Sequence, residues 1–589
     1  MCGIAGVLRS DFSSEMLLDA LDHRGPDSRG HVELGPCSLA ATRLAIMDPR
    51  RDADQPMTEG QTTIVLNGEI YNFADLRLEL SAYGWSFETS GDTEVVLKAI
   101  LQWGKEALSR LRGMYALLAW HADRQELWAA RDRFGIKPLY SGLLRGGNGV
   151  CFSSEATALT ELVGRRVRPQ AVGEFLHFGS PYSTNIFDDV FELPAGSLTI
   201  WKADGSISLH PIESAPTTGL TVQDLLADTV RRHLISDRPV ALFLSGGFDS
   251  ALIASQAAVV APDALVAVTL DTGHNPDDVA FASQTATHYG MPHRIIGYDP
   301  QEIVRLADAY FDLMDQPTVD GFNTYLVSDA ANTLGYPVAL SGLGGDEAFG
   351  GYGYYGRSPR VARASRVVRR FPALIRDRVN QVVGARTGRS GAQVAAIFDA
   401  VSTAERYRAW RSLFTATEVQ RLTGCRPPSP AILLGETDDE YRDLRTLDFE
   451  LYLRSTLLRD VDVFSMACGV EVRVPLLDNS VVDHVVNQLP HLSKRSIAAA
   501  LADPFLVDIA HRRKIPFRLP WQDWLHVIDP LRDLLDAGDP WHGLVDPAEA
   551  RQMLHESAPN SVDRPLALLV LARWLHKLSV PRRIAKRPI

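Results

Sequence analysis

A cysteine directly after the initiator methionine is the first residue of this 589-residue chain that could act as a nucleophile. The chain opens Met1-Cys2-Gly3-Ile4, and removal of Met1 would leave Cys2 with both a thiol and a free α-amine. Because an α-amine titrates near neutrality, it can take the thiol proton and later protonate leaving ammonia. Taken alone, Cys2 is more often a chance residue at a frayed terminus. Taken as chemistry, it suits acyl transfer from an amide.

A second set of chemical residues follows an apolar run. Val240 to Leu244 has the pattern of a buried strand, and Ser245-Gly246-Gly247-Phe248-Asp249-Ser250 and an apolar helix come next. Glycine amides, serine hydroxyls and a helix N-terminus together favour a bound phosphate. The chain has no GxxxxGK[ST] here, so γ-phosphoryl transfer of the Walker type is not indicated. The alternative is that this segment is only a tight turn between two core elements.

A third loop, Ser341 to Tyr352, follows another apolar strand, Pro337 to Leu340. If the two strands are neighbours in a parallel sheet, Asp249 and Asp346 come together at its carboxyl edge. Magnesium prefers one or two carboxylates together with phosphate oxygens and water. The pair Asp249 and Asp346 is therefore our predicted Mg²⁺ site.

The elements that must position these residues differ between the two halves of the chain. Up to about residue 205, short alternating runs mix with helical spacing and predict an α+β domain of antiparallel sheets with helices. Its expected strands are Ser38 to Ile46, Thr62 to Leu66, Met114 to Trp120 and Glu126 to Ala130, and its expected helices Phe73 to Tyr83 and Thr93 to Trp103.

The second half begins after Gly205 to Gly219, a polar stretch without periodicity in which we place the domain boundary. From Leu220 a helix to about His233, the strand Pro239 to Leu244, a helix from Ser250 and the strand Ala264 to Leu270 predict an α/β domain with a parallel sheet. After Tyr355 helical spacing dominates, broken by an expected Gly-rich loop near Gly384 to Gly391. We thus expect domains at residues 2–205 and 220–580.

Composition restricts the partners and the compartment. The chain carries a net charge of -12, with 46% hydrophobic and 22% charged residues, which argues against nucleic acid or a membrane surface as partner. Its five cysteines are scattered and never spaced as CxxC, which indicates a reducing compartment. No apolar run approaches the roughly 18 residues of a membrane span. We expect a soluble, cytoplasmic protein that acts on small molecules, with a homodimer as one option for its assembly.

The N-terminal half resembles the class II glutamine amidotransferases, which have an N-terminal-nucleophile fold. The resemblance rests on Cys2, His23-Arg24-Gly25-Pro26-Asp27, Arg43-Leu44-Ala45-Ile46, Asn67-Gly68-Glu69-Ile70-Tyr71-Asn72, Ser90-Gly91-Asp92-Thr93-Glu94, Arg131 to Tyr140, Ser153-Ser154-Glu155 and Leu193-Pro194-Ala195-Gly196. It implies glutamine hydrolysis at Cys2, with the Asn67 side chain and the Gly68 amide as donors to the oxyanion.

The same resemblance implies how glutamine is held. Arg43 would bind its α-carboxylate, and Asp92 with Glu69 would pair with its ammonium. Leu44 and Ile46 would complete the pocket. Each of these residues could also have a purely structural role. Arg43 could form a surface salt bridge, Asn67-Gly68 could form a turn, and Asp92 could cap a helix.

The second half resembles the ATP-pyrophosphatase domain of glutamine-hydrolysing asparagine synthetases. The SGGxDS loop, the loop after Leu340, the run Gly469 to Asp478 and Arg513 to Phe517 carry this likeness. It implies adenylation of a carboxylate by ATP and its amidation by ammonia, with Lys514 stabilising charge on the phosphates. The implied ATP-binding residues are Leu244, Ser245, Gly246, Gly247, Asp249, Ser250, Val268, Ser341 and Gly342.

One position departs from the family pattern. Asparagine synthetases carry a glutamate where this chain has Leu343, and leucine can neither pair with an ammonium nor accept a proton. Two hypotheses about the acceptor substrate stay open. It is either aspartate held by other groups or a different carboxylic acid in a specialised pathway. An amide-forming cyclase that uses an amine of its own substrate and a ligand sensor without turnover are the rivals.

The stretch Arg357 to Arg389 holds ten arginines among apolar residues. An amphipathic helix with a solvated face is the favoured interpretation. A lid or docking surface for an anionic substrate is the alternative.

Overall fold

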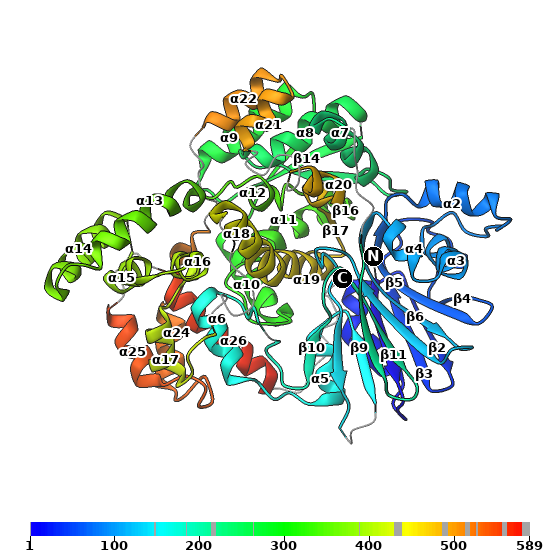
Figure 1. Cartoon of the computed structure of the whole chain (residues 1–589), viewed down its shortest axis with the longest axis horizontal. Helices are drawn as coiled ribbons and strands as arrows, with labels where there is room; N and C mark the ends of the chain where they lie inside the picture. The colour runs from blue at the N-terminus through cyan, green and yellow to red at the C-terminus, as the bar shows by residue number, and fades with distance from the viewer. Residues whose placement is uncertain are drawn as a thin grey trace.

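The structure is a computed structural model that describes residues 2–145, 149–183, 185–213, 220–262, 264–387, 389–428, 437, 439–485, 493–512, 519–525, 528–556 and 562–579. Its two halves lie side by side, with the strand-rich half on the right of Figure 1 and the helix-rich half on the left. Among the described helices, none is both long and apolar enough to cross a membrane.

The N-terminal half contains two six-stranded antiparallel sheets packed face to face. The first has the order β10-β8-β9-β1-β3-β2, and the second β12-β11-β7-β6-β5-β4. Their strands are β1 (Cys2–Leu8), β2 (Ser28–Leu34), β3 (Cys37–Arg43), β4 (Met57–Glu59), β5 (Thr62–Ile70), β6 (Gly113–His121), β7 (Glu126–Arg131), β8 (Tyr140–Leu143), β9 (Val150–Ser153), β10 (Val190–Glu192), β11 (Ser197–Lys202) and β12 (Ile207–Pro211).

Helices cover the outer face of each sheet. The helices α2 (Phe73–Ala82), α3 (Thr93–Trp103) and α4 (Glu106–Arg110) pack on the second sheet, and α5 (Ala156–Val163) and α6 (Pro169–Phe178) on the first. Strand alternation produces this layering, since Val65 points between the sheets while Ile64 and Leu66 point toward the helices. The predicted α+β architecture is confirmed.

The C-terminal half is built on a five-stranded parallel sheet of order β15-β14-β13-β16-β17. The strands are β13 (Val240–Phe243), β14 (Leu265–Asp271), β15 (His293–Gly297), β16 (Val338–Leu340) and β17 (Glu471–Arg473). Ala241 packs on one face of the sheet and Leu242 on the other, and helices cover both faces. This explains the continuous apolar runs in the sequence and confirms the predicted α/β domain.

The helices around this sheet begin with α7 (Val222–His233), where Thr221 and Asp224 form a reciprocal capping box. The others are α8 (Phe248–Val260), α9 (Pro276–His288), α10 (Pro300–Leu313), α11 (Phe322–Thr333), α12 (Gly345–Ala348), α13 (Gly353–Val368), α14 (Ala373–Thr387), α15 (Gly391–Asp399), α16 (Thr403–Arg411), α17 (Ala416–Thr423), α18 (Glu440–Leu447), α19 (Arg459–Ala467), α20 (Asn479–Asp483), α21 (Lys494–Ala500), α22 (Pro504–His511), α23 (Trp521–Leu525), α24 (Ile528–Asp536), α25 (Pro547–Glu556) and α26 (Asp563–Ser579). A π-helical segment, Asp448–Leu458, joins α18 to α19.

Two local expectations differ from the structure. The stretch 205–219 was expected to lack regular structure, yet β12 pairs there with β11 and extends the second sheet past residue 205. A short edge strand with one half-buried and four exposed residues has too few apolar positions to show as a pattern. The sequence predicts a loop at Gly384, but Gly384 lies inside α14, where the residues on both sides of it are helical.

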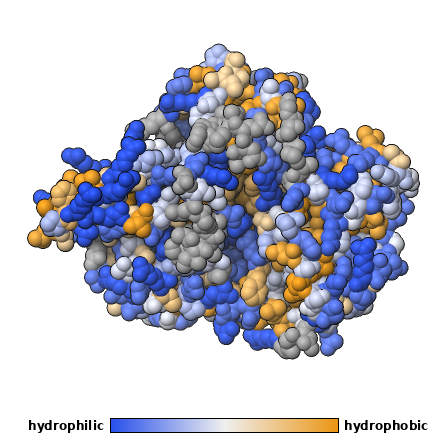
Figure 2. All heavy atoms as spheres, in the orientation of Figure 1, coloured by the Kyte–Doolittle hydropathy of each residue, from blue (hydrophilic) through white to orange (hydrophobic). Residues whose placement is uncertain are grey.

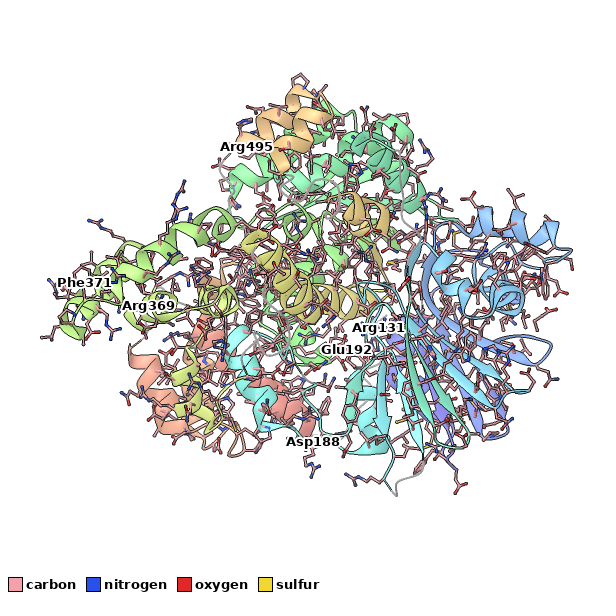
Figure 3. All side chains as sticks on the ribbon, in the orientation of Figure 1. Arg131, Asp188, Glu192, Arg369, Phe371 and Arg495 are labelled. Atoms are coloured by element: carbon pink, nitrogen blue, oxygen red, sulfur yellow. The ribbon has the colours of Figure 1, made fainter. Side chains whose placement is uncertain are left out.

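The arginine-rich stretch forms α13 and α14, which project from the left of the molecule in Figure 1. Most of its arginines are exposed to solvent, in agreement with the predicted solvated face. Figure 3 shows Arg369 and Phe371 on this arm, and apolar side chains accompany the basic ones along it in Figure 2.

Buried ion pairs hold the two halves together. Arg24 of the first half is fully buried and reaches Asp462 of α19 at 2.6 Å and Glu155 at 3.1 Å. Lys137 approaches the other oxygen of Asp462 at 3.3 Å. Burial alone would raise the pKa of Glu155, but His23 and Arg24 outweigh it and lower that pKa to about 2. The interface therefore depends on complementary charges that water does not screen.

Substitution Asp462→Asn should destabilise the protein strongly, because it leaves Arg24 and Lys137 buried without their carboxylate. Removing one partner of a buried ion pair costs about 3–5 kcal/mol. The control is Asp188→Asn, labelled in Figure 3, whose partners are the largely exposed Arg166 and the half-buried Arg168. A surface pair contributes about 0–1 kcal/mol. Denaturant unfolding of both variants measures the difference, and equal losses would contradict the role of Asp462.

Two candidate active sites

Cys2 lies at the start of β1, opposite Arg43 at the end of β3. Its backbone N–H donates to Asn67 Oδ1 at 3.1 Å, and Gln55 Nε2 donates to its Sγ at 3.5 Å. Asn67 belongs to β5 of the facing sheet, so the thiol sits where the two sheets meet. Burial raises the pKa of the Cys2 thiol, with Arg43 opposing in part. A protonated resting thiol needs a base close by.

One pocket collects the residues expected to bind glutamine. It is lined by Cys2, Arg43, Leu44, Ile46, Gly68, Glu69 and Asp92 among others. Asn67 stands beside it through its bond to Cys2, and its buried Nδ2 has no hydrogen-bond partner among the described residues. A buried donor left without a partner costs about 1–3 kcal/mol unless a ligand accepts from it.

Gly68 is required at its position by the backbone. Its φ is +136°, and a Cβ there would lie 1.9 Å from the carbonyl oxygen of Met114. Only glycine fits this close approach of β5 to β6. Its backbone therefore lines the pocket beside Cys2 with no side chain between them.

The pocket has a basic wall and an acidic wall. Arg43 is buried and bonds Asp54 at 2.9 Å and the carbonyls of Met47 and Asp48, so its position is fixed. On the other wall burial raises the pKa of Asp92, and burial with Glu471 and Asp92 raises that of Glu69. Asp92 pairs with no lysine or arginine that the structure describes, and Glu69 has Arg473 4.0 Å away, so this wall is complementary to an α-ammonium group.

Asp92 also illustrates how tertiary structure decides between alternatives. It occupies the N-cap position of α3 but makes no capping hydrogen bond, and instead accepts from the Ile70 amide at 2.8 Å. Sequence reasoning missed Gln55, which bonds both the thiol of Cys2 and the backbone of Leu66. A lone glutamine before a proline carries no signal that could have identified it.

The second candidate site lies at the carboxyl ends of three adjacent parallel strands. The loop 245–250 follows β13, Val268 lies in β14, and Ser341 and Gly342 follow β16. A Cβ on Gly342 would stand 2.8 Å from the Ser250 amide nitrogen, so the two loops are in contact. The Leu244 amide donates to the Val268 carbonyl at 2.9 Å. The predicted ATP-binding residues thus converge at one sheet edge, where α/β proteins bind ligands.

Lys494 joins the two predicted metal ligands and was not singled out from the sequence. Its Nζ lies 2.5 Å from Asp249 Oδ2 and 2.5 Å from Asp346 Oδ1. Burial by itself would lower the pKa of Lys494, but the two carboxylates raise it, so the ammonium stays charged. Lys514, the other predicted lysine, lies outside the described residues.

Arg473 connects the two sites. This fully buried residue of β17 lies 4.0 Å from Glu69 in the first pocket, and its carbonyl accepts from the Ser341 amide at 2.9 Å in the second site. Its guanidinium also bonds Glu471 at 2.5 Å and the carbonyls of His233 and Ile235. One residue thus contacts both candidate sites.

Comparison with known proteins agrees with this geometry. Residues 1–211 match the family model of the glutamine amidotransferase domain, and residues 221–576 match that of asparagine synthase. The fold and the paired sites define a glutamine amidotransferase joined to an ATP-dependent synthase domain. The second match covers more than half of the chain, which therefore belongs to the asparagine synthase family.

Similar curated proteins include asparagine synthetase [glutamine-hydrolyzing] 1 of Bacillus subtilis, 29% identical over 89% of this chain and 88% of its own. A putative asparagine synthetase of Mycobacterium tuberculosis strain H37Rv is 29% identical over 97% and 95%. The amidase chry2 of Gibberella zeae is 29% identical over 62% and 59%. The chain is thus a carbon–nitrogen ligase that uses glutamine as nitrogen donor and ATP as energy source.

Substitution Asn67→Ala should lower kcat for glutamine hydrolysis by about 10²- to 10³-fold, the usual loss of one oxyanion donor. The KM for glutamine should change little, because a donor to the oxyanion, the role predicted for the Asn67 Nδ2, serves the transition state and not the bound substrate. Glutamate release measures the effect. Synthesis supplied with ammonium chloride is the internal control and should keep its rate. A raised KM with normal kcat would contradict this role.

Substitution Lys494→Met should lower pyrophosphate release by about 10²-fold or more, because it removes a fixed positive charge at the predicted phosphate site. Glutamine hydrolysis should be unaffected. The matched control is Arg495→Met, the next residue of α21, which is exposed and labelled in Figure 3. Equal rates in the two variants would show that Lys494 has only a structural role.

Proposed function

We propose that this protein makes asparagine from aspartate, with nitrogen taken from glutamine at Cys2. The observation that carries the proposal is the pocket in which Cys2, Arg43 and Asp92 meet, with Asn67 beside it, joined through Arg473 to the predicted nucleotide loops. The first pocket matches an amino acid with a terminal amide, since it offers a cation, a pair of carboxylates and a nucleophile.

In the first step the Cys2 thiolate attacks the amide carbon of glutamine, and the α-amine of Cys2 takes the thiol proton and transfers it to the departing ammonia. Asn67 Nδ2 and the Gly68 amide stabilise the oxyanion, and water then hydrolyses the thioester to glutamate. The raised pKa of the buried thiol is consistent with this need for an adjacent base.

In the second step an oxygen of the acceptor carboxylate attacks the α-phosphorus of ATP and displaces pyrophosphate. Ammonia then attacks the acyl carbon and AMP leaves. The loop amides of residues 245–250 and the ammonium of Lys494 hold the phosphates. These groups stabilise the negative charge that builds up as pyrophosphate departs.

Asp249 and Asp346 fit the Mg²⁺ that this chemistry uses. Their carboxylates converge on a single cation, the Lys494 ammonium, which shows that they lie close enough to share one charge. No cluster of three metal-binding side chains occurs among the described residues, and magnesium completes its shell with phosphate oxygens and water. When bound, the ion would neutralise charge on the nucleotide phosphates.

Leu343 and the likeness to the amidase chry2 support a second candidate, amidation of a different acid in a specialised pathway. Leu343 packs against the apolar core of the synthase half and bonds Ser341 only through its backbone amide, so its side chain contributes no polar contact. The glutaminase pocket argues against a cyclase that supplies its own amine, because such an enzyme has no need of Cys2.

A reaction with glutamine, ATP and aspartate should release glutamate, AMP and pyrophosphate in equal amounts. Cys2→Ala should abolish turnover with glutamine and keep it with ammonium chloride, since the synthase half is unchanged. Pyrophosphate release over a panel of other small acids is the comparison. ADP as product would refute adenylation, and full activity of Cys2→Ala with glutamine would favour the cyclase.

A further inference from the structure

Two opposite charges lie against the same tyrosine without pairing with each other. Arg411 at the end of α16 lies over the ring of Tyr452, with its guanidinium carbon 3.2 Å from the ring centroid. At the edge of the ring Tyr452 donates its hydroxyl to Asp320 Oδ2 at 3.2 Å. Tyr452 belongs to the π-helical segment, and such segments often occur at functional sites.

Arg411 is a half-buried cation that lies among aromatic rings and hydrogen-bonds the Tyr452 side chain. Besides Tyr452 it lies near Tyr352 and Phe178, and it makes no ion pair with any carboxylate that the structure describes. Asp448 is the carboxylate that interacts electrostatically with Arg411. It already accepts hydrogen bonds from the hydroxyls of three tyrosines. A guanidinium without a carboxylate beside an active site is suited to an anion.

Asp320 is the complementary group. Its carboxylate accepts from Tyr452 and from the Gly321 amide at 2.8 Å, and within the described ranges no lysine or arginine pairs with it. It precedes α11 and is half-buried. Arg411 and Asp320 both contact Tyr452 but form no ion pair with each other, so a ligand that carries both signs can pair with each.

The pair also lies next to the reacting centre. Tyr352 donates its hydroxyl to Glu347 at 2.5 Å, and Glu347 directly follows Asp346. Tyr352 in turn stands beside Arg411 and Tyr452. Arg411 is thus connected through Tyr352 to Glu347, the sequence neighbour of the predicted metal ligand Asp346, so the pair and the predicted metal site belong to one region of the synthase half.

We infer that Arg411, Tyr452 and Asp320 form the acceptor subsite and select an α-amino dicarboxylic acid. Arg411 binds the carboxylate that is not adenylated, and Asp320 binds the ammonium. This inference rests on the proposed function and explains how the acceptor is recognised although Leu343 offers no polar group.

Three acids separate the two contacts. Aspartate carries both groups, β-alanine lacks the α-carboxylate and succinate lacks the ammonium, while all three keep a carboxylate that can be adenylated. Pyrophosphate release by the full-length protein gives a KM for each. Arg411→Met should raise the KM for aspartate and succinate about 10- to 100-fold, as expected for a charge-assisted contact, and leave that for β-alanine unchanged.

Asp320→Asn should show the opposite pattern, with weaker binding of aspartate and β-alanine and no change for succinate. The matched control is Arg454→Met, two residues from Tyr452, whose arginine already pairs with Glu450. Glutamine hydrolysis serves as the check that each variant is folded and should keep the rate of the unsubstituted protein.

A uniform rise of KM for all three acids, or an unchanged KM for aspartate in both variants, would overturn the subsite and leave the reaction in place. If the unsubstituted protein releases no pyrophosphate with aspartate, the proposed substrate fails and the subsite fails with it.

Discussion

The rest of the structure depends on the ion pairs and hydrogen bonds of the buried Arg473 guanidinium. It is completely enclosed, yet it bonds Glu471, approaches Glu69 and donates to two backbone carbonyls at the end of α7. Burial by itself would lower the pKa of Arg473, but Glu471 and Glu69 raise it, so the charge persists. An isolated buried charge is prohibitively unfavourable, which means that both halves must supply partners for this residue.

This constraint couples the two sites by position. Glu69 lines the pocket at Cys2, and Ser341 begins the second predicted nucleotide loop. Each is fixed relative to Arg473. A second ionic cluster, Arg24 with Asp462 and Lys137, holds the same interface at another point. Directional bonds of this kind fix one orientation of the halves, whereas apolar packing alone tolerates sliding. A defined orientation suits an enzyme in which one half produces ammonia that the other consumes.

Charge is used differently in the synthase half. At the nucleotide loops opposite charges are in contact, because Lys494 lies between Asp249 and Asp346 and keeps two carboxylates close together. At Tyr452 opposite charges stay unpaired, because Arg411 lies over the ring and Asp320 accepts from its hydroxyl. The first arrangement neutralises acidic groups at the predicted phosphate site. The second is the arrangement that we infer to bind a zwitterionic acceptor beside the apolar Leu343.

The sequence by itself determined the local chemistry of this protein. Cys2 follows Met1, the apolar run Val240 to Leu244 makes a buried strand, and the glycines of the loop 245–250 allow a turn, since these properties depend on neighbours along the chain. It also indicated both fold classes, because hydrophobic periodicity reports which faces are buried. Only the tertiary structure decided which distant residues come together. Gln55 lies at Cys2, Arg473 lies between the two sites, Lys494 lies between two aspartates, and Arg411 and Asp320 both contact Tyr452. Such pairs are separated by tens to hundreds of residues, and a charged or polar side chain has the same local pattern whether it is solvated or buried against a distant partner.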